Sequence, residues 1–397
     1  MLPNPDDAHR RGVGVGSRFP VGYHALHPDV ALNFQLNRFW NWVGEDRMLA
    51  QLRDAASRIV TYQDWTRELL ALGEQALSEA RPLPAAYLFR MAEFFLPAED
   101  PRKRPLRQRF LQLVRTEHEV GDEAHHLIPY QQGVLSAYRF TPSSPRGRIV
   151  VFGGFDSYIE EWFPFGLALR DHGLDVVAFD GPGQGAALEA GVPMTADWQR
   201  PVAAVLDHFG LDDVALMGFS LGGGLVMHAA AHEPRVRRVI AQDILSDFTE
   251  CYARPLGVPR STFVKHATRL PDRLVNAVIA AARRHDMLAD WGVREGMRVF
   301  GVAHPAELLD AIRTLRTDAV SPLVEQDVLL MAGRADHYVP LHQLGDQITT
   351  LTRARSVTAR VFTEAEQAQN HVQVGNLGLA LGVIVDWLDT VTDRDRT

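Results

Sequence analysis

A short apolar run that turns into a helix through the pattern Gly-Phe-Ser-Leu-Gly is the feature that most constrains how this chain folds. The run covers residues 214–217, the pattern is Gly218-Phe219-Ser220-Leu221-Gly222, and an apolar, helix-prone stretch follows at once. A strand that turns sharply into a helix needs residues with almost no side chain two positions before and after the apex, and the two glycines meet that need. The pattern therefore predicts that Ser220 is a nucleophile and that the N–H of Leu221, at the helix start, stabilises an oxyanion.

Length and charge place the protein among ordinary soluble enzymes. The 397 residues are enough for a full core and for more than one folding unit. A net charge of −8 gives no electrostatic reason to expect nucleic acid or an anionic membrane as a partner. The single cysteine, Cys251, excludes an intrachain disulfide and a Cys-x-x-Cys metal or redox site. The first residues lack the apolar core of a signal peptide, so we expect a soluble, cytoplasmic protein without a membrane span.

Residues 1–122 are predicted to form an N-terminal helical domain. Apolar residues recur at helical spacing over residues 31–42, 46–58, 61–79, 83–95 and 106–116. Aromatic side chains such as Trp40, Trp42 and Phe94 lie on these segments. We interpret most of them as helix–helix core and a minority as the wall of a pocket against the second domain.

Residues 123–397 are predicted to form an α/β domain built on a doubly wound, mostly parallel sheet. Strand patterns cover residues 125–130, 134–140, 148–152, 175–179, 214–217, 236–242, 327–331 and 356–362, and most are separated by helical patterns. The alternation pauses at about residues 247–322, where the spacing is helical, most clearly over 270–284 and 305–315. This insertion follows the strand after the elbow, on the side of the sheet that faces ligands, so we predict that it is a lid.

Position in the topology selects an acid and a base among many candidates. In the chain order Ser, acid, His, the acid follows the next-to-last strand and the histidine follows the last one. Asp336 and His371 occupy those two places. The alternative for Asp336 is a turn or helix-cap role, and the alternative for His371 is a loop histidine satisfied by the backbone. His337 is a rival base, but it neighbours the acid and is expected to point elsewhere.

Two further loops bear on the site. The loop after the strand at 148–152 reads Gly153-Gly154-Phe155-Asp156-Ser157, and the N–H of Phe155 is the candidate for the second oxyanion donor. The glycine-rich loop at residues 180–185 lacks the spacing of a phosphate-binding loop and is interpreted as structural.

Two aspartates follow the strand after the elbow. Asp243 and Asp247 lie near the start of the predicted lid, and either could face the pocket. Asp247 is our candidate auxiliary residue, and the alternative is that such a residue caps the next helix.

Several motifs together resemble those of α/β-hydrolases with an extra helical N-terminal domain, the group that includes 2,6-dihydroxypseudooxynicotine hydrolase and fungal polyketide-shortening hydrolases. The matching segments are, in chain order, AAYLFRM at 85–91 with DPRK at 100–103, GGFDS at 153–157 with Glu160 and Glu161, DGPGQG at 180–185, the elbow, GRAD at 333–336 and HVQVGN at 371–376. The resemblance implies a triad of Ser220, Asp336 and His371 with an oxyanion hole at Phe155 and Leu221. It also implies that the substrate bond is often a carbon–carbon bond next to a ketone.

The sequence thus predicts a serine hydrolase that acts on an ester or a ketone C–C bond of a small aromatic or polyketide-like molecule in secondary metabolism. No cofactor or metal is expected, and a homodimer is plausible from the aromatic-rich helical domain. The main alternative is a lyase or cyclase that uses the same fold for acyl elimination or ring closure. A non-catalytic binding protein on the same scaffold is a further alternative.

Overall fold

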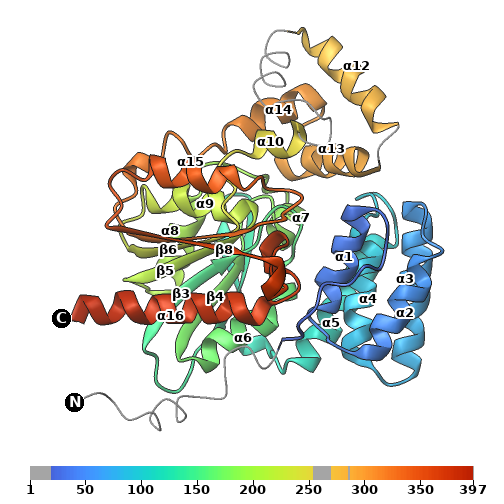
Figure 1. Cartoon of the computed structure of the whole chain (residues 1–397), viewed down its shortest axis with the longest axis horizontal. Coiled ribbons are helices and arrows are strands. Elements are labelled where there is room, and N and C mark those ends of the chain that lie inside the picture. The colour runs from blue at the N-terminus through green and yellow to red at the C-terminus, as the bar shows by residue number, and fades with distance from the viewer. Residues whose placement is uncertain (1–18, 254–269, 285–286, 397) are drawn as a thin grey trace.

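A computed structural model describes residues 19–253, 270–284 and 287–396. Its N-terminal part is a group of helices, as the sequence predicts (Figure 1). Local signals explain their boundaries, because Asp29 caps the first helix and Thr61 forms a reciprocal capping box with Asp64 at the third. The helices are α1 (Val30–Trp40), α2 (Asp46–Ala56), α3 (Tyr62–Ser78), α4 (Pro82–Phe94) and α5 (Lys103–Glu117).

The second part is built on one eight-stranded sheet in the order β1-β2-β4-β3-β5-β6-β7-β8. β1 pairs with β2 and β2 with β4 in antiparallel fashion, and every other pair is parallel. This arrangement confirms the predicted α/β fold class with a mostly parallel sheet. The strands are β1 (His125–Tyr130), β2 (Gly133–Phe140), β3 (Gly147–Phe152), β4 (Leu174–Asp180), β5 (Val214–Phe219), β6 (Val236–Gln242), β7 (Asp327–Gly333) and β8 (Ser356–Phe362).

Helices cover both faces of the sheet, because alternate strand residues point to opposite sides. On one face Val151 and Met217 pack in a cluster with α6 (Phe163–Asp171) and α16 (Leu377–Arg396). On the other face Val150 and Leu216 pack with α8 (Gln199–Phe209) and α9 (Leu221–Ala230). The remaining sheet-side helices are α7 (Gly185–Glu189) and α15 (His342–Thr350).

The predicted helical insertion lies between β6 and β7. Its described helices are α10 (Phe248–Ala253), α12 (Asp272–Arg283), α13 (Met287–Phe300) and α14 (Pro305–Arg313). Figure 1 shows them as a separate group above α9 and α15, on the side where the N-terminal helices lie. Several contacts join the insertion to those helices and to the residue that follows α4, among them a hydrogen bond from Arg294 Nη2 to Phe95 O at 3.1 Å. The Tyr62 hydroxyl donates to Met287 O at 2.7 Å, and the Phe94 and Trp291 rings stack at 5.3 Å.

The N-terminal helices share their core with the sheet. One continuous cluster of buried apolar side chains contains Phe39 and Leu88 from those helices together with Ile149 and Val151 from β3. Among the described residues no single helix is long and apolar enough to cross a bilayer, although the segments 364–373 and 377–395 pass that composition test as a pair bent by 81°. The residues at the carboxyl ends of the parallel strands form the candidate site described next.

Candidate active site

The turn between β5 and α9 holds Ser220 in a strained backbone conformation. Its φ of 57° and ψ of −117° are unusual for a residue with a side chain. The flanking glycines make the turn sterically possible. A Cβ on Gly218 would lie 2.1 Å from Gly222 O, and a Cβ on Gly222 would lie 2.5 Å from Gly153 O. The physical reason that the sequence suggested for the two glycines therefore applies in the structure.

His371 and Asp336 lie beside Ser220, in the chain order that the topology predicted. The distance from His371 Nε2 to Ser220 Oγ is 2.8 Å, and the distance from His371 Nδ1 to Asp336 Oδ2 is 2.6 Å. The other Asp336 oxygen, Oδ1, accepts hydrogen bonds from the backbone N–H groups of Tyr338 and Val339 at 2.7 and 2.9 Å. These two bonds fix the carboxylate so that Oδ2 faces the imidazole.

Burial and charge have opposite effects on the pKa values of His371 and Asp336. Burial alone would lower the pKa of His371, but the charge and hydrogen bond of Asp336 outweigh it and raise the pKa above its ordinary value. Burial alone would raise the pKa of Asp336, but the His371 imidazole outweighs it and holds that pKa below its ordinary value. Asp336 is therefore poised to stay ionised while it stabilises a proton on the imidazole.

The structure brings Asp243, and not Asp247, to the imidazole. Asp243 directly follows β6, is buried, and places Oδ2 3.3 Å from His371 Nδ1. Asp247 instead accepts a hydrogen bond from Thr249 N at 3.0 Å at the start of α10, and its other oxygen lies 3.6 Å from Arg316 Nε. It is absent from the cavity wall. The candidate auxiliary position at Asp247 is thus a helix cap, the alternative that the sequence left open.

The loop at residues 153–157, which we call the oxyanion loop after the predicted role of Phe155, lies directly against the elbow. A Cβ on Gly154 would lie 3.1 Å from Ser220 Cβ and 3.3 Å from Leu221 N. Leu221 is the first residue of α9, so its N–H has no acceptor within the helix. Phe155 and Leu221 both line the cavity at Ser220. The two residues that carry the predicted donors therefore border the same cavity.

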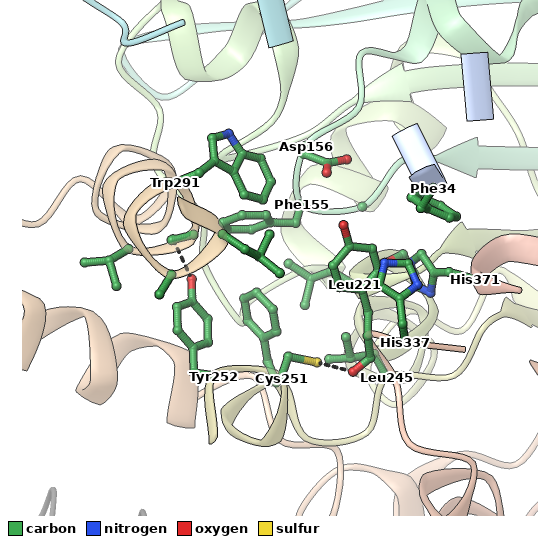
Figure 2. Close-up of a pocket in the computed structure, with 18 of the residues that line it drawn as sticks. Phe34, Phe155, Asp156, Leu221, Leu245, Cys251, Tyr252, Trp291, His337 and His371 are labelled. Carbon is green, nitrogen blue, oxygen red and sulfur yellow. Dashed lines mark hydrogen bonds between the residues drawn. The ribbon is translucent and has the colours of Figure 1, made fainter. Parts of the chain in front are cut away.

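A cavity of about 510 Å³ opens above Ser220 and is largely apolar. Figure 2 shows Phe155 and Trp291 close together on one side of this cavity and His337 and His371 on another. His337 lies 4.9 Å from the ring of Phe34, and it is His371 that contacts Ser220. The wall combines α1, the oxyanion loop and the insertion helices, with Phe34, Trp42, Phe155, Phe248, Trp291 and Leu308 as its main apolar members.

The chemistry of the donor set disfavours a metal ion here. Asp243, Asp336 and His371 bring one ligand atom each to within 4.8 Å of one another. Both ring nitrogens of His371 are already engaged, one with Ser220 and one with Asp336. Backbone N–H groups point at the Asp243 oxygens, so a cation would face donated hydrogens. The arrangement suits proton transfer between oxygen and nitrogen.

Comparison with known proteins decides the family. The family model for the alpha/beta hydrolase fold matches residues 147–365, which include Ser220 and Asp336. The chain belongs to the α/β-hydrolase family. It is similar to "Hydrolyase poxO" of Penicillium oxalicum, at 28% identity over 80% of this chain and 85% of the relative. It is also similar to "20-hydroxy-prefusarin hydrolase FUS2" of Gibberella moniliformis, at 31% identity over 47% of this chain and 49% of the relative.

A solved structure has the same overall fold. The crystal structure of the 2,6-dihydroxy-pseudo-oxynicotine hydrolase matches with a TM-score of 0.61 at 20% identity and covers 88% of this chain and 94% of that chain. The resemblance that the sequence motifs suggested is therefore confirmed, and this α/β-hydrolase is an enzyme of the hydrolase class.

Two buried arginines of the hydrolase hold the oxyanion loop, a role that no motif or periodicity in the sequence indicates. Arg90, on α4, donates from Nη2 to Asp156 O at 2.7 Å and from Nε to Glu161 at 2.7 Å. Arg38, on α1, donates to Asp156 Oδ1 at 3.0 Å and to Glu161 Oε2 at 2.7 Å. Both arginines lie on the N-terminal helices, so those helices position a loop of the site.

The glycine-rich loop at residues 180–185 braces the same segment from the other side. The Gln184 amide donates to Gly153 O at 2.8 Å and to Gly154 O at 2.9 Å, and Asp180 Oδ1 accepts from Ile159 N at 3.0 Å. The loop is structural, as predicted, and its task is to support the oxyanion loop. The sequence feature that could have indicated this role is Gln184, which lies between the last two glycines. A buried glutamine needs hydrogen-bond partners for both its amide N–H groups and its oxygen.

Proposed function

We propose that this hydrolase uses Ser220 as a nucleophile, His371 as general base and Asp336 as the acid that orients the imidazole. The observation that carries the proposal is the unbroken chain of short contacts from Ser220 Oγ through both nitrogens of His371 to Asp336, at 2.8 and 2.6 Å. This chain ends at the floor of a largely apolar cavity, where a bound carbonyl group would meet Ser220 Oγ.

The geometry supports covalent catalysis in two steps. His371 Nε2 accepts the Ser220 proton while Oγ bonds to the substrate carbonyl carbon, and the N–H groups of Phe155 and Leu221 stabilise the resulting oxyanion. The protonated imidazole, stabilised by Asp336, then gives its proton to the leaving group as the bond to that group breaks. Water attacks the acyl-enzyme by the same route, which releases the acid and restores Ser220.

The cavity favours an aromatic or polyketide-like substrate with either an ester or a ketone C–C bond at the reacting centre. Its wall is rich in rings, with Phe155 and Trp291 packed edge to face at 6.0 Å and Phe155 and Phe248 at 5.4 Å. The names of the 2,6-dihydroxy-pseudo-oxynicotine and 20-hydroxy-prefusarin hydrolases point the same way. The leaving group is an alkoxide in the first reaction and an enolate carbon in the second.

A fluorophosphonate probe tests the nucleophile. Intact-mass and peptide analysis should find one adduct per chain, on Ser220, and Ser220→Ala should remove both the adduct and the hydrolysis of p-nitrophenyl butyrate. Ser78→Ala is the control, because Ser78 is an exposed serine at the end of α3 and does not belong to the cavity wall. Labelling of another residue, or full hydrolysis by Ser220→Ala, would refute the proposal.

A rapid-quench experiment on the unaltered enzyme tests the alternative reaction. A lyase or cyclase that uses Ser220 and His371 only as a base forms no acyl-enzyme. If incubation with an aromatic ester leaves no covalent acyl adduct in a rapid-quench sample, while product still forms, the lyase or cyclase mechanism is favoured over hydrolysis through an acyl-enzyme.

A further inference from the structure

A second buried carboxylate lies beside the imidazole of His371. Asp243 follows β6 with a φ of 60°, and its side chain is almost fully buried. Its Oδ1 accepts hydrogen bonds from Gly333 N at 3.1 Å and Gln373 Nε2 at 2.9 Å, and its Oδ2 accepts one from Val372 N. The carboxylate therefore joins the end of β7 to the loop that carries His371.

Both carboxylates converge on one nitrogen. Asp336 Oδ2 lies 2.6 Å from His371 Nδ1, and Asp243 Oδ2 lies 3.3 Å from the same atom. Nδ1 carries a single hydrogen, so in the resting geometry the shorter contact takes the hydrogen bond. The longer contact lies within reach of that hydrogen after a small rotation of the imidazole. Asp336 thus accepts the hydrogen bond from His371 Nδ1, and Asp243 lies near enough to accept it instead.

Charge explains why the two acids differ in state. The titratable groups that face Asp243 from the described neighbouring elements are Asp336, after β7, and His371, after β8; on the α9 side, Gly223 packs against its backbone. Burial and then the Asp336 charge raise the pKa of Asp243 to about 7. Asp243 is therefore partly protonated near neutral pH while Asp336 is ionised. Removal of the Asp336 charge would lower the pKa of Asp243 and let it ionise.

We propose that Asp243 is a second positioning acid for His371, which takes over the Nδ1 hydrogen when Asp336 cannot accept it. The inference rests on the proposed Ser220–His371–Asp336 function and adds a residue to it. Asp243 touches neither the substrate nor Ser220 in this role. It acts by holding the imidazole in the tautomer and orientation that leave Nε2 free to accept the Ser220 proton.

A double-mutant cycle tests the inference. The variants are Asp336→Asn, Asp243→Asn and the combination, each assayed by the rate of fluorophosphonate labelling of Ser220 and by p-nitrophenyl butyrate hydrolysis between pH 5 and 9. Where a single acid serves the histidine, an Asp→Asn change costs about 10⁴-fold in rate. If Asp243 can accept the Nδ1 hydrogen in place of Asp336, we expect the rate to fall only about 10²-fold in Asp336→Asn and about 10⁴-fold in the double variant.

The cycle also separates positioning from a merely structural role. A structural role would make Asp243→Asn lower the rate by the same factor with Asp336 present or replaced. We expect a factor below about ten in the first background and about 10² in the second. Asp346→Asn is the control, because Asp346 has a 70% exposed side chain on α15 and should leave both rates unchanged.

Two outcomes would overturn the inference. One is an Asp336→Asn variant that has already lost about 10⁴-fold, which decides the matter even if Asp243→Asn fails to fold. The other is equal factors for Asp243→Asn in both backgrounds. Failure of the proposed function is recognised separately, since Ser220→Ala would then keep its hydrolysis and the probe would label elsewhere.

Discussion

At the scale of single residues, His371 must be uncharged before its Nε2 can accept the Ser220 proton. Asp336 raises the pKa of His371 above its ordinary value, so the protonated, inactive imidazole persists to a higher pH than for a free histidine. We expect the labelling rate of Ser220 to rise with pH along an acid limb whose midpoint lies above about 6.5. A stopped-flow series with a fluorophosphonate probe measures that midpoint.

His342 supplies the control for this pH profile. It lies on α15 with a 58% exposed side chain, so His342→Asn should leave the midpoint unchanged. A labelling rate that does not vary between pH 5 and 9, or a midpoint well below that of a free histidine, would contradict the assignment of His371 as the base.

Also at the residue scale, Gly222 is fixed by the oxyanion loop and not only by the helix start. A Cβ at this position would lie 2.5 Å from Gly153 O, a backbone atom. We expect Gly222→Ala to push the loop away from Ser220, to lower kcat, and to reduce the free energy of unfolding by about 1–3 kcal/mol. Steady-state kinetics and urea unfolding measure the two effects.

Gly382 is the matched position for that variant. It lies on α16, and an added Cβ meets no atom within 4 Å. Gly382→Ala should raise the free energy of unfolding by up to about 1 kcal/mol, because alanine favours the helix, and should leave kcat unchanged. A Gly222→Ala variant that behaves in the same way would show that the elbow has more room than the structure gives it.

At the scale of elements, α4 supports the oxyanion loop through Arg90. The guanidinium is 2% exposed and reaches Asp156 O, Glu161 and Glu93 at once. Lysine keeps the charge but cannot span three acceptors. We expect Arg90→Lys to lower kcat by about tenfold, less than the 10²–10³ of a lost oxyanion donor. We also expect a loss of about 1–3 kcal/mol in the free energy of unfolding.

The comparison for Arg90 is Arg47, on α2, whose side chain is 54% exposed in its pair with Glu79. Arg47→Lys should change the free energy of unfolding by less than about 0.5 kcal/mol and leave kcat alone. Equal kinetic effects for the two variants would mean that α4 does not position the loop.

At this scale, the predicted and observed elements show which parts of the structure can be predicted from the sequence. The strands β1, β6 and β8 have the predicted bounds, because period-two patterns and flanking turns are local signals. The places of Ser220, Asp336 and His371 followed from topology, since each lies in the segment that follows the carboxyl end of a parallel strand. The Arg38 and Arg90 contacts were not predictable, because they join segments 66 to 123 residues apart and no periodicity records such pairs.

The neighbourhood of Asp243 was hidden for a related reason. Asp243 and Asp247 both follow β6, and it is Asp243, with a left-handed backbone, whose carboxylate lies beside His371. The sequence does not indicate this conformation, because aspartate can adopt the left-handed region and no glycine is needed there. Residue type alone therefore does not distinguish the two aspartates.

At the scale of the whole molecule, the helical and sheet parts are joined as one unit by a shared core. Phe39 and Leu88 belong to the same buried cluster as Ile149 and Val151, and Arg90 crosses the same boundary. The N-terminal helices cannot melt alone without exposing this apolar surface and leaving Glu161 buried without its partners. We expect one cooperative transition in differential scanning calorimetry, with equal calorimetric and van't Hoff enthalpies, checked at two scan rates. Two resolved transitions would instead support a helical domain that ends near residue 122 and unfolds independently, with a core of its own.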